Sequence, residues 1–192
     1  MSSTFVVYVE DKPGVLNRVA SLFRRRAFNI ESLTVGHTDT PGVSRMTIVV
    51  GTDRDGARKV EAHLYKLVNV LRVDDVTSTP AVYRDLAMIK VQATAETRSH
   101  IMQLVDVYRA RIVDVAPDSL MVEVTGTEDK IDSLLDVLRP YGVIEAVRTG
   151  RVAMARGGPR TPRLRRASAA LRGPMPRVPR DAGHAGPVPL SA

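Results

Sequence analysis

The chain has 192 residues, a length that suits one domain or two small ones, and it contains no cysteine. Disulfides, thiolate nucleophiles and cysteine-based metal sites are therefore excluded, and the composition is compatible with a reducing cytoplasm, where we expect the protein to act. The formal net charge of +7 belongs mostly to residues 157–192, where seven arginines accompany one acidic residue, so residues 1–156 are nearly balanced.

Membrane and secretory functions are not expected. No apolar run approaches the roughly 20 residues that a membrane helix needs. The N-terminus also lacks a charged leader followed by an apolar core, so we predict no secretory signal.

The first 76 residues predict the element order β-α-β-β-α-β, the split βαβ arrangement of ferredoxin-like folds. Strands are expected over residues 4–9, 28–38, 44–50 and 70–76. A first helix is expected to begin at Pro13, because proline suits the first helical position. Its apolar face would consist of Val15, Leu16, Val19, Leu22 and Phe23. A second helix opens at residues 53–56, and its apolar side would consist of Val60, Leu64, Leu67 and Val68.

The same order repeats after a linker at residues 77–80. Strands are expected over residues 85–93, 111–116, 120–125 and 142–149, and Thr94 and Thr127 would cap the two helices. The predicted fold class is α+β, with two tandem ferredoxin-like domains at residues 1–78 and 79–156. Residues 157–192 hold seven of the twelve prolines and no apolar periodicity, so this basic tail is predicted to be disordered.

The turn between the first strand and the first helix is the candidate binding site. Gly14 permits close approach of the backbone to a ligand. The N–H groups of Gly14, Val15 and Leu16 would lie at the start of the helix, where they form a site for an anion. On local grounds alone, an ordinary turn that binds only water is the more frequent outcome.

Catalytic motifs are not found in the sequence. The four histidines are scattered without metal-ligand spacing, and neither a nucleophile elbow nor a phosphate-binding loop is present. This pattern favours a binding module over an enzyme, and we predict no metal site.

Four segments closely resemble the regulatory (small) subunit of acetolactate synthase, also called acetohydroxyacid synthase. They are residues 10–16 (EDKPGVL), 28–35 (FNIESLTV), 44–48 (SRMTI) and 67–73 (LVNVLRV). The resemblance covers residues 4–156 in order, and residues 1–78 resemble an ACT domain, a small amino-acid-sensing module. The tail lies outside the resemblance.

The resemblance implies a non-catalytic regulatory function in the biosynthesis of valine, leucine and isoleucine. The chain would activate a catalytic (large) subunit and confer feedback inhibition by a branched-chain amino acid, valine. That partner joins two 2-keto acids and would hold thiamine diphosphate, Mg²⁺ and FAD, and we expect none of these cofactors in this chain.

The resemblance also implies where valine binds. Two ACT domains of the family pair side by side with the amino acid between them, so we expect a homodimer. The expected ligand-binding residues are Asp11, Gly14, Val15, Leu16, Asn29, Ile30 and Val35. The ligand carboxylate would accept hydrogen bonds from the backbone at the helix start. Its ammonium would pair with Asp11, the nearest charged candidate, or with strand carbonyls. The branched side chain would contact the apolar residues of this set, and Asn29 would come from the partner chain.

Asp11 is a departure from the family, in which this position is often asparagine. A carboxylate here repels the ligand carboxylate and attracts the ligand ammonium. The departure therefore concerns feedback sensitivity and leaves the predicted fold unchanged.

Two other functions fit parts of the sequence. An RNA-recognition fold has the same element order, and the tail is basic, but that fold needs aromatic residues on its central strands, and aromatics are only 4% of the chain. Nucleic acid is therefore not the expected partner. A third hypothesis is an amino-acid sensor for a different enzyme. It would differ from an acetolactate synthase regulatory subunit in the protein that co-purifies with it.

Overall fold

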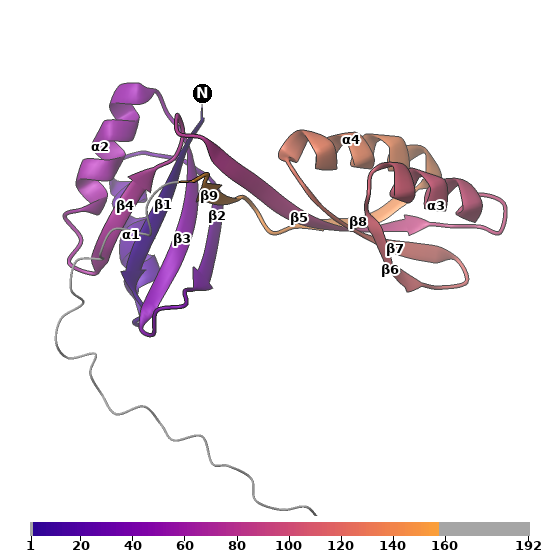
Figure 1. Cartoon of the computed structure of the whole chain (residues 1–192), viewed down its shortest axis with the longest axis horizontal. Helices are drawn as coiled ribbons and strands as arrows, with labels where there is room; N and C mark the ends of the chain where they lie inside the picture. Colours follow the sequence, from indigo (N-terminus) through magenta and orange to yellow (C-terminus); the bar gives the residue numbers. More distant parts are fainter. Residues whose placement is uncertain (1, 158–192) are drawn as a thin grey trace, which may run out of the picture.

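The computed structural model describes residues 2–157, which form two halves joined by one long strand (Figure 1). The first half contains β1 (Ser2–Glu10), α1 (Val15–Arg25), β2 (Ile30–His37), β3 (Val43–Gly51), α2 (Arg54–Leu64) and β4 (Val70–Asp75). Its strands form an antiparallel sheet in the order β2-β3-β1-β4. The predicted ferredoxin-like order is confirmed for this half, which we call the N-terminal domain.

The second half, the C-terminal domain, repeats this arrangement. It contains β5 (Ala81–Gln92), α3 (Arg98–Val107), β6 (Arg111–Val115), β7 (Ser119–Gly126), α4 (Glu128–Leu138), the short 3-10 helix η1 (Arg139–Tyr141) and β8 (Val143–Arg148). The sheet order is β6-β7-β5-β8, again antiparallel. The prediction of two tandem ferredoxin-like domains is therefore confirmed.

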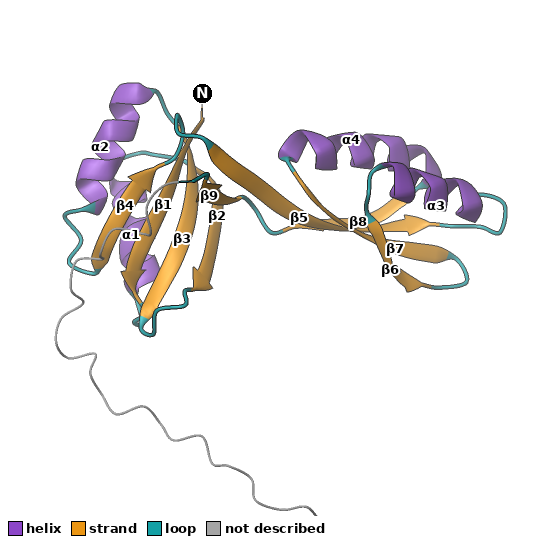
Figure 2. Cartoon of the chain, viewed as in Figure 1, coloured by secondary structure: helices purple, strands orange, loops and turns teal. Residues whose placement is uncertain are grey.

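Helices cover one face of each sheet, and the two cores lie between these layers (Figure 2). Alternate residues of each central strand point to the helices, as the two-residue period of a strand requires. The N-terminal core includes Phe5, Phe23 and Ile48, and the C-terminal core includes Ile89 and Leu134, all at most 1% exposed. Each such side chain contributes about 1.5–3 kcal/mol of burial free energy.

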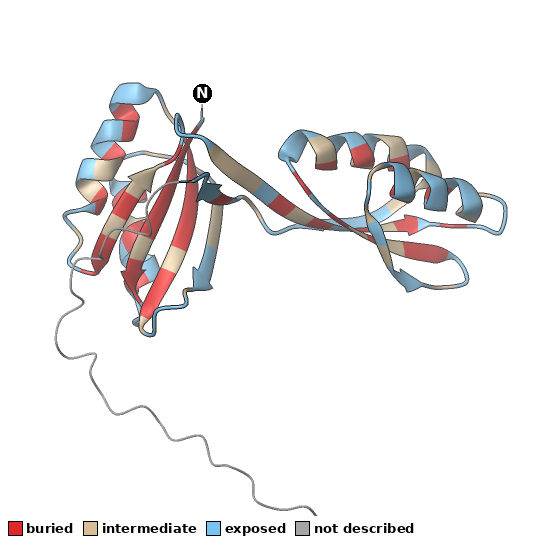
Figure 3. Cartoon of the chain, in the orientation of Figure 1, coloured by how far each residue is buried: buried red, intermediate tan, exposed pale blue. Residues whose placement is uncertain are grey.

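The edge strands differ from the central strands in burial. Residues of β1 and β3 are largely buried, whereas β2 and β8 are half-buried or exposed (Figure 3). An edge strand presents backbone groups that can pair with another chain. β2 is an outer strand of this kind in the N-terminal sheet.

A ninth strand, β9 (Val152–Ala155), was not predicted from the sequence. It pairs with residues 81–84 of β5, so β5 begins four residues earlier than the predicted strand over 85–93. This two-stranded ribbon packs on the face of the N-terminal sheet opposite the helices, where Ala153 is buried with Val6 and Val76. β5 thus contributes its first third to one domain and the rest to the other.

Three local predictions are wrong. Helix α1 begins at Val15 and not at Pro13, because Gly14 adopts a left-handed conformation that ends the preceding turn. Val68 is 83% exposed, because α2 ends at Leu64 and the chain turns before β4. Thr94 does not cap α3, which begins at Arg98. Its hydroxyl instead accepts a hydrogen bond from the Thr97 N–H at 3.3 Å within the turn before the helix.

The boundary that we propose between residues 78 and 79 lies in the loop between β4 and β5. Apart from Gly157, the tail predicted to be disordered lies outside the described residues. None of the helices found within residues 2–157 is long and apolar enough to cross a bilayer.

Candidate functional site

The turn between β1 and α1 is a β-turn formed by residues 12–15. The Val15 N–H donates to the Lys12 carbonyl at 3.3 Å, with Pro13 and Gly14 between them. Gly14 has φ 80°, a left-handed conformation that glycine adopts without steric cost. Proline followed by a positive-φ glycine is typical of a type II turn, which explains why these two residues precede the helix and do not begin it.

The backbone at this turn leaves three N–H groups without an acceptor in the described part of the chain, those of Gly14, Leu16 and Asn17. The first turn of α1 contains no acidic side chain that could neutralise the positive end of the helix. Nothing lies within 4 Å of the position that a Cβ of Gly14 would occupy. The turn is thus an open group of donors at a helix N-terminus, which suits a small anion.

Val15 contributes less than the sequence indicated. Its N–H already has an acceptor, and its side chain is buried in the N-terminal core at 4% exposure. Leu16, which was expected on the apolar face of the helix, is 44% exposed, and Val35 on β2 is 43% exposed. Leu16 and Val35 are therefore the most exposed apolar side chains of the predicted set, and Ile30 is half-buried.

A buried polar network beneath the turn holds it in place. Glu10 is 6% exposed, and its Oε2 accepts hydrogen bonds from Asn69 Nδ2 at 2.8 Å and from Lys12 Nζ at 2.9 Å. Asn69 Oδ1 in turn accepts from Arg18 Nη1 at 2.7 Å, which ties the network to α1. This network was not predicted from the sequence, although Glu10, a charged residue at the end of a buried strand, was a signal that could have indicated it.

Asp11 lies at the edge of the turn that faces the β2–β3 loop. Its backbone N–H donates to the Gly42 carbonyl at 2.9 Å, and its Oδ2 lies 3.3 Å from His37 Nδ1. The carboxylate is about half exposed, so it remains available to a cation in solution.

Asn29 and Ile30 lie at the opposite end of the sheet from the turn of the same chain. β1 and β2 are both antiparallel to β3, so they run in the same direction. Ile30 pairs with Val50, which pairs with Ser3 at the start of β1, whereas the turn follows the end of β1. One chain alone therefore does not bring Asn29 to the Gly14 turn.

Groups suited to metal binding are absent from the part of the chain that the structure describes. No three histidine or carboxylate side chains gather there closely enough to hold a metal ion.

Comparison with known proteins agrees with this architecture. Residues 5–72 match a family model described as an acetohydroxyacid synthase small subunit-like ACT domain, and residues 84–157 match one described as the small subunit of acetolactate synthase. A probable acetolactate synthase small subunit of Archaeoglobus fulgidus is 52% identical over 157 residues, which cover 82% of this chain and 98% of the relative. This chain belongs to the acetolactate synthase small-subunit family.

Other members of the small-subunit family confirm the extent of the match. The acetolactate synthase small subunit of Mycolicibacterium smegmatis is 48% identical over 154 residues, covering 80% of this chain and 91% of the relative. The crystal structure of the acetolactate synthase small subunit from Thermotoga maritima has a TM-score of 0.77 and 38% identity, covering 82% of this chain and 99% of that chain. The resemblance found in the sequence is therefore confirmed, and it includes both domains.

Proposed function

We propose that this chain is the regulatory subunit of an acetolactate synthase that acts in branched-chain amino acid biosynthesis. It would associate with the catalytic subunit, raise its activity and convey feedback inhibition by valine. Thiamine diphosphate, Mg²⁺ and FAD belong to the catalytic subunit in this proposal, and no residue of this chain is assigned to them. Membership of the small-subunit family supports the proposal, together with the open donor group at the Gly14 turn.

A homodimer formed through β2 would complete the valine site. Two β2 edges that pair antiparallel about a two-fold axis set the start of one strand against the end of the other. Asn29 and Ile30 of the partner subunit would then approach the end of the sheet that carries the Gly14 turn. Asn29 and Ile30 lie far from the Gly14 turn of their own chain, which is expected if two chains form each site.

The bound amino acid would make three kinds of contact. Its carboxylate would accept hydrogen bonds from the N–H groups of Gly14 and Leu16, and its ammonium would lie near the Asp11 carboxylate. Its branched side chain would contact Leu16, Val35 and Ile30 of the partner subunit. The amide of the partner's Asn29 can both donate and accept, so it suits a zwitterion.

The geometry of Gly14 is the observation that supports the proposed valine site most strongly. A positive φ, open space at the missing Cβ and unpaired N–H groups on either side of Val15 occur together at a helix start that has no acidic side chain in its first turn. Inhibition would follow if valine binds the inhibited state of the complex more tightly than the active state, since a ligand shifts an equilibrium only by its differential affinity.

Reconstitution with the catalytic subunit tests the proposal. The full chain is added to the purified catalytic subunit, and condensation of 2-keto acids is measured with and without valine. We expect higher activity with the chain present and inhibition by valine only in the complex. Activity that is unchanged by the chain would contradict the proposal and would favour a sensor for another enzyme.

RNA binding is not favoured. Tyr8 lies on the sheet face where an RNA-recognition fold stacks bases, but the guanidinium carbons of Arg45 and Arg72 lie 5.9 and 5.8 Å from its ring centroid. The β5–β9 ribbon also packs on this face, where Tyr8 contacts the cluster around Ala153. The aromatic ring is therefore already occupied, and no exposed stacking surface remains at this position.

A further inference from the structure

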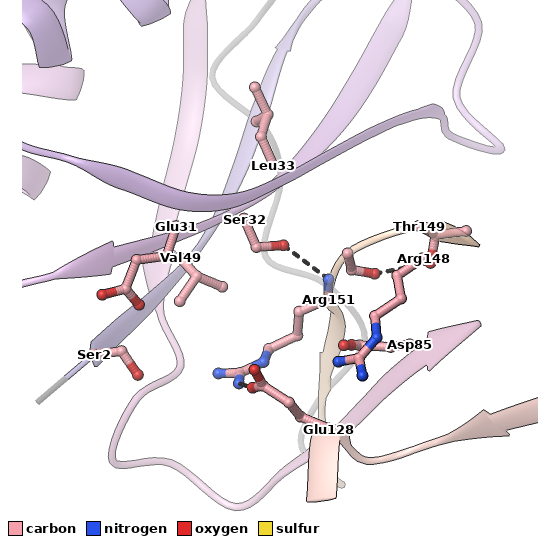
Figure 4. Close-up of a pocket in the computed structure, with 11 residues that line it drawn as sticks. Ser2, Glu31, Ser32, Leu33, Val49, Asp85, Glu128, Arg148, Thr149 and Arg151 are labelled. Atoms are coloured by element: carbon pink, nitrogen blue, oxygen red, sulfur yellow. Dashed lines mark hydrogen bonds and ion pairs between the residues drawn. The ribbon is translucent and has the colours of Figure 1, made fainter. Parts of the chain in front are cut away.

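The chain crosses between the two domains twice, once along β5 and once through residues 149–151. The second crossing returns the chain from β8 to β9 and passes directly over the outer strand β2 of the N-terminal sheet. Figure 4 shows Arg151 and Thr149 beside Ser32, with the side chains of the C-terminal domain on the other side of the cleft.

Residues 149–151 are in direct contact with β2. The Arg151 N–H donates to Ser32 Oγ at 2.9 Å, and Thr34 Oγ1 donates to the Thr149 carbonyl at 3.4 Å. Gly150 has φ 86°, and a Cβ at this position would lie 2.6 Å from Ser32 Oγ. A side chain at this position would strain the left-handed backbone and displace the Ser32 hydroxyl that holds the crossing segment, so glycine is favoured here.

The Arg151 side chain joins elements of both domains. Nη2 donates to Glu128 Oε2 of α4 at 2.9 Å, and Nη1 donates to Thr4 Oγ1 of β1 at 3.3 Å. The guanidinium carbon lies 5.5 Å from the ring centroid of Tyr83 on β5. The Arg151 side chain is 22% exposed and that of Glu128 is 56% exposed, so the contact with Thr4 is shielded from solvent more than the ion pair with Glu128.

The same crossing is fixed to the C-terminal domain by Thr149 and Arg148. The Thr149 N–H donates to the Leu86 carbonyl at 3.0 Å, and the Leu86 N–H donates to Thr149 Oγ1 at 3.2 Å. Arg148 forms an ion pair with Asp132 of α4. Residues 149–151 would thus transmit a displacement of β2 to both β5 and α4.

We propose that Arg151 is the positioning residue through which the location of β2 sets the orientation of the C-terminal domain. Asn29 directly precedes β2, and Ile30 and Val35 lie on it. A ligand at the proposed dimer site would therefore displace the strand whose Ser32 and Thr34 hydroxyls hold the crossing segment. The regulatory part of this inference rests on the proposed function, whereas the mechanical part does not.

Distance measurement between two spin labels tests the mechanical part. The chain has no cysteine, so Arg58→Cys on α2 and Met102→Cys on α3, both exposed, label one domain each without background. Labelled chain is diluted into an excess of unlabelled chain, so that distances within one subunit dominate. We expect a narrow distance distribution in the parent chain and a broad one in Arg151→Ala and in Ser32→Ala, which removes the contact from the β2 side.

Two variants serve as controls. Arg111→Ala removes an ion pair of similar length, 3.1 Å between Arg111 Nη2 and Glu123 Oε1, that lies wholly within the C-terminal domain, and it should leave the distribution narrow. Arg151→Lys retains the cation but not the forked guanidinium geometry. Its distance distribution should therefore be narrower than that of Arg151→Ala and broader than that of the parent chain. Circular dichroism checks that each variant is folded. A distribution in Arg151→Ala as narrow as in the parent chain overturns the proposal.

Valine added to the same samples tests the regulatory part. In the parent chain we expect the mean distance to shift when valine binds. In Arg151→Ala we expect no shift, although calorimetry should show a valine Kd within about threefold of the parent value, because Arg151 contacts none of the residues proposed to bind valine. An equal shift in both chains overturns the coupling. Absence of valine binding to the parent chain would instead refute the proposed function, and the ligand-free comparison would still decide the mechanical part.

Discussion

The carboxyl group of Asp85 lies where the two domains meet, next to side chains of both signs of charge. Asp85 is 8% exposed and lines a cleft of about 400 Å³ with Glu128, Arg148 and Arg151 (Figure 4). Burial raises the pKa of Asp85 above its ordinary value of 3.8, and Glu128 and Asp132 act in the same direction, whereas Arg151 and Arg148 oppose the rise.

The raised pKa predicts how Asp85→Asn changes stability with pH. A carboxyl whose pKa is higher in the folded state is a destabilising group once it is ionised, and this cost is absent below its unfolded pKa. Asp85→Asn should therefore raise the melting temperature at pH 7, and the difference should shrink as the pH falls toward 4. Thermal denaturation at several pH values measures it. A lower melting temperature for Asp85→Asn at pH 7 would show that the attraction of Asp85 to Arg151 and Arg148 outweighs burial.

Residues around the turn show what the sequence could predict. The spacing of Val15, Val19 and Leu22 correctly indicated the buried face of α1. The same spacing also included Leu16, which lies at the margin of that face and is exposed. Pro13 is compatible with both a first helical position and a turn, and the glycine that follows it was the local signal that favoured a type II turn.

At the scale of elements, the network of Glu10, Asn69 and Arg18 joins the end of β1, the start of β4 and the first turns of α1. The Glu10 N–H also donates to the Asn69 carbonyl at 2.9 Å, so the network fixes both backbone and side chains. It holds the helix start in the position that leaves the N–H groups of the turn open.

Asn69→Ala should destabilise the fold and loosen the turn. The change removes one donor to the buried Glu10 carboxylate and the acceptor of Arg18, so we expect a loss of about 1–3 kcal/mol in unfolding free energy. Urea denaturation measures this loss, with Gln103→Ala on the exposed side of α3 as a control that should change stability by less than about 0.5 kcal/mol. A stability equal to that of the parent chain would show that the other partners of Glu10 suffice.

Strand β9 is the one strand within residues 2–157 that the sequence did not predict. The eight strands of the two sheets have alternating or β-branched sequences that indicated them in advance. β9 has only four residues, and its pairing with residues 81–84 joins segments about 70 residues apart. Such pairing depends on how the two domains meet, which local sequence does not encode, so the joint and its Arg151 contacts were not predicted.

At the scale of the whole molecule, the exposed β2 edge and the separation of Asn29 from the Gly14 turn both point to association. We predict a homodimer with two equivalent sites. Light scattering of the full chain at micromolar concentration, with valine present, should give twice the mass of one chain. A monomer mass under these conditions would contradict the shared site.

Binding of valine to Gly14→Asp tests whether the turn before α1 is the amino-acid site. Aspartate would place a negative charge where the ligand carboxylate is proposed to lie. Losing two charge-assisted hydrogen bonds costs about 3 kcal/mol or more, which is at least about a hundredfold in Kd. Gly157→Asp is a matched control, since Gly157 also has a positive φ and open space at its Cβ position but lies far along the chain.

Isothermal titration calorimetry of the full chain with valine is the measurement. We expect one valine per chain in the parent protein and in Gly157→Asp, and binding weaker by about a hundredfold or more in Gly14→Asp, with a folded dimer in all three. Unchanged valine binding in a dimeric Gly14→Asp would contradict the proposed site, because it would show that the amino acid binds away from the Gly14 turn.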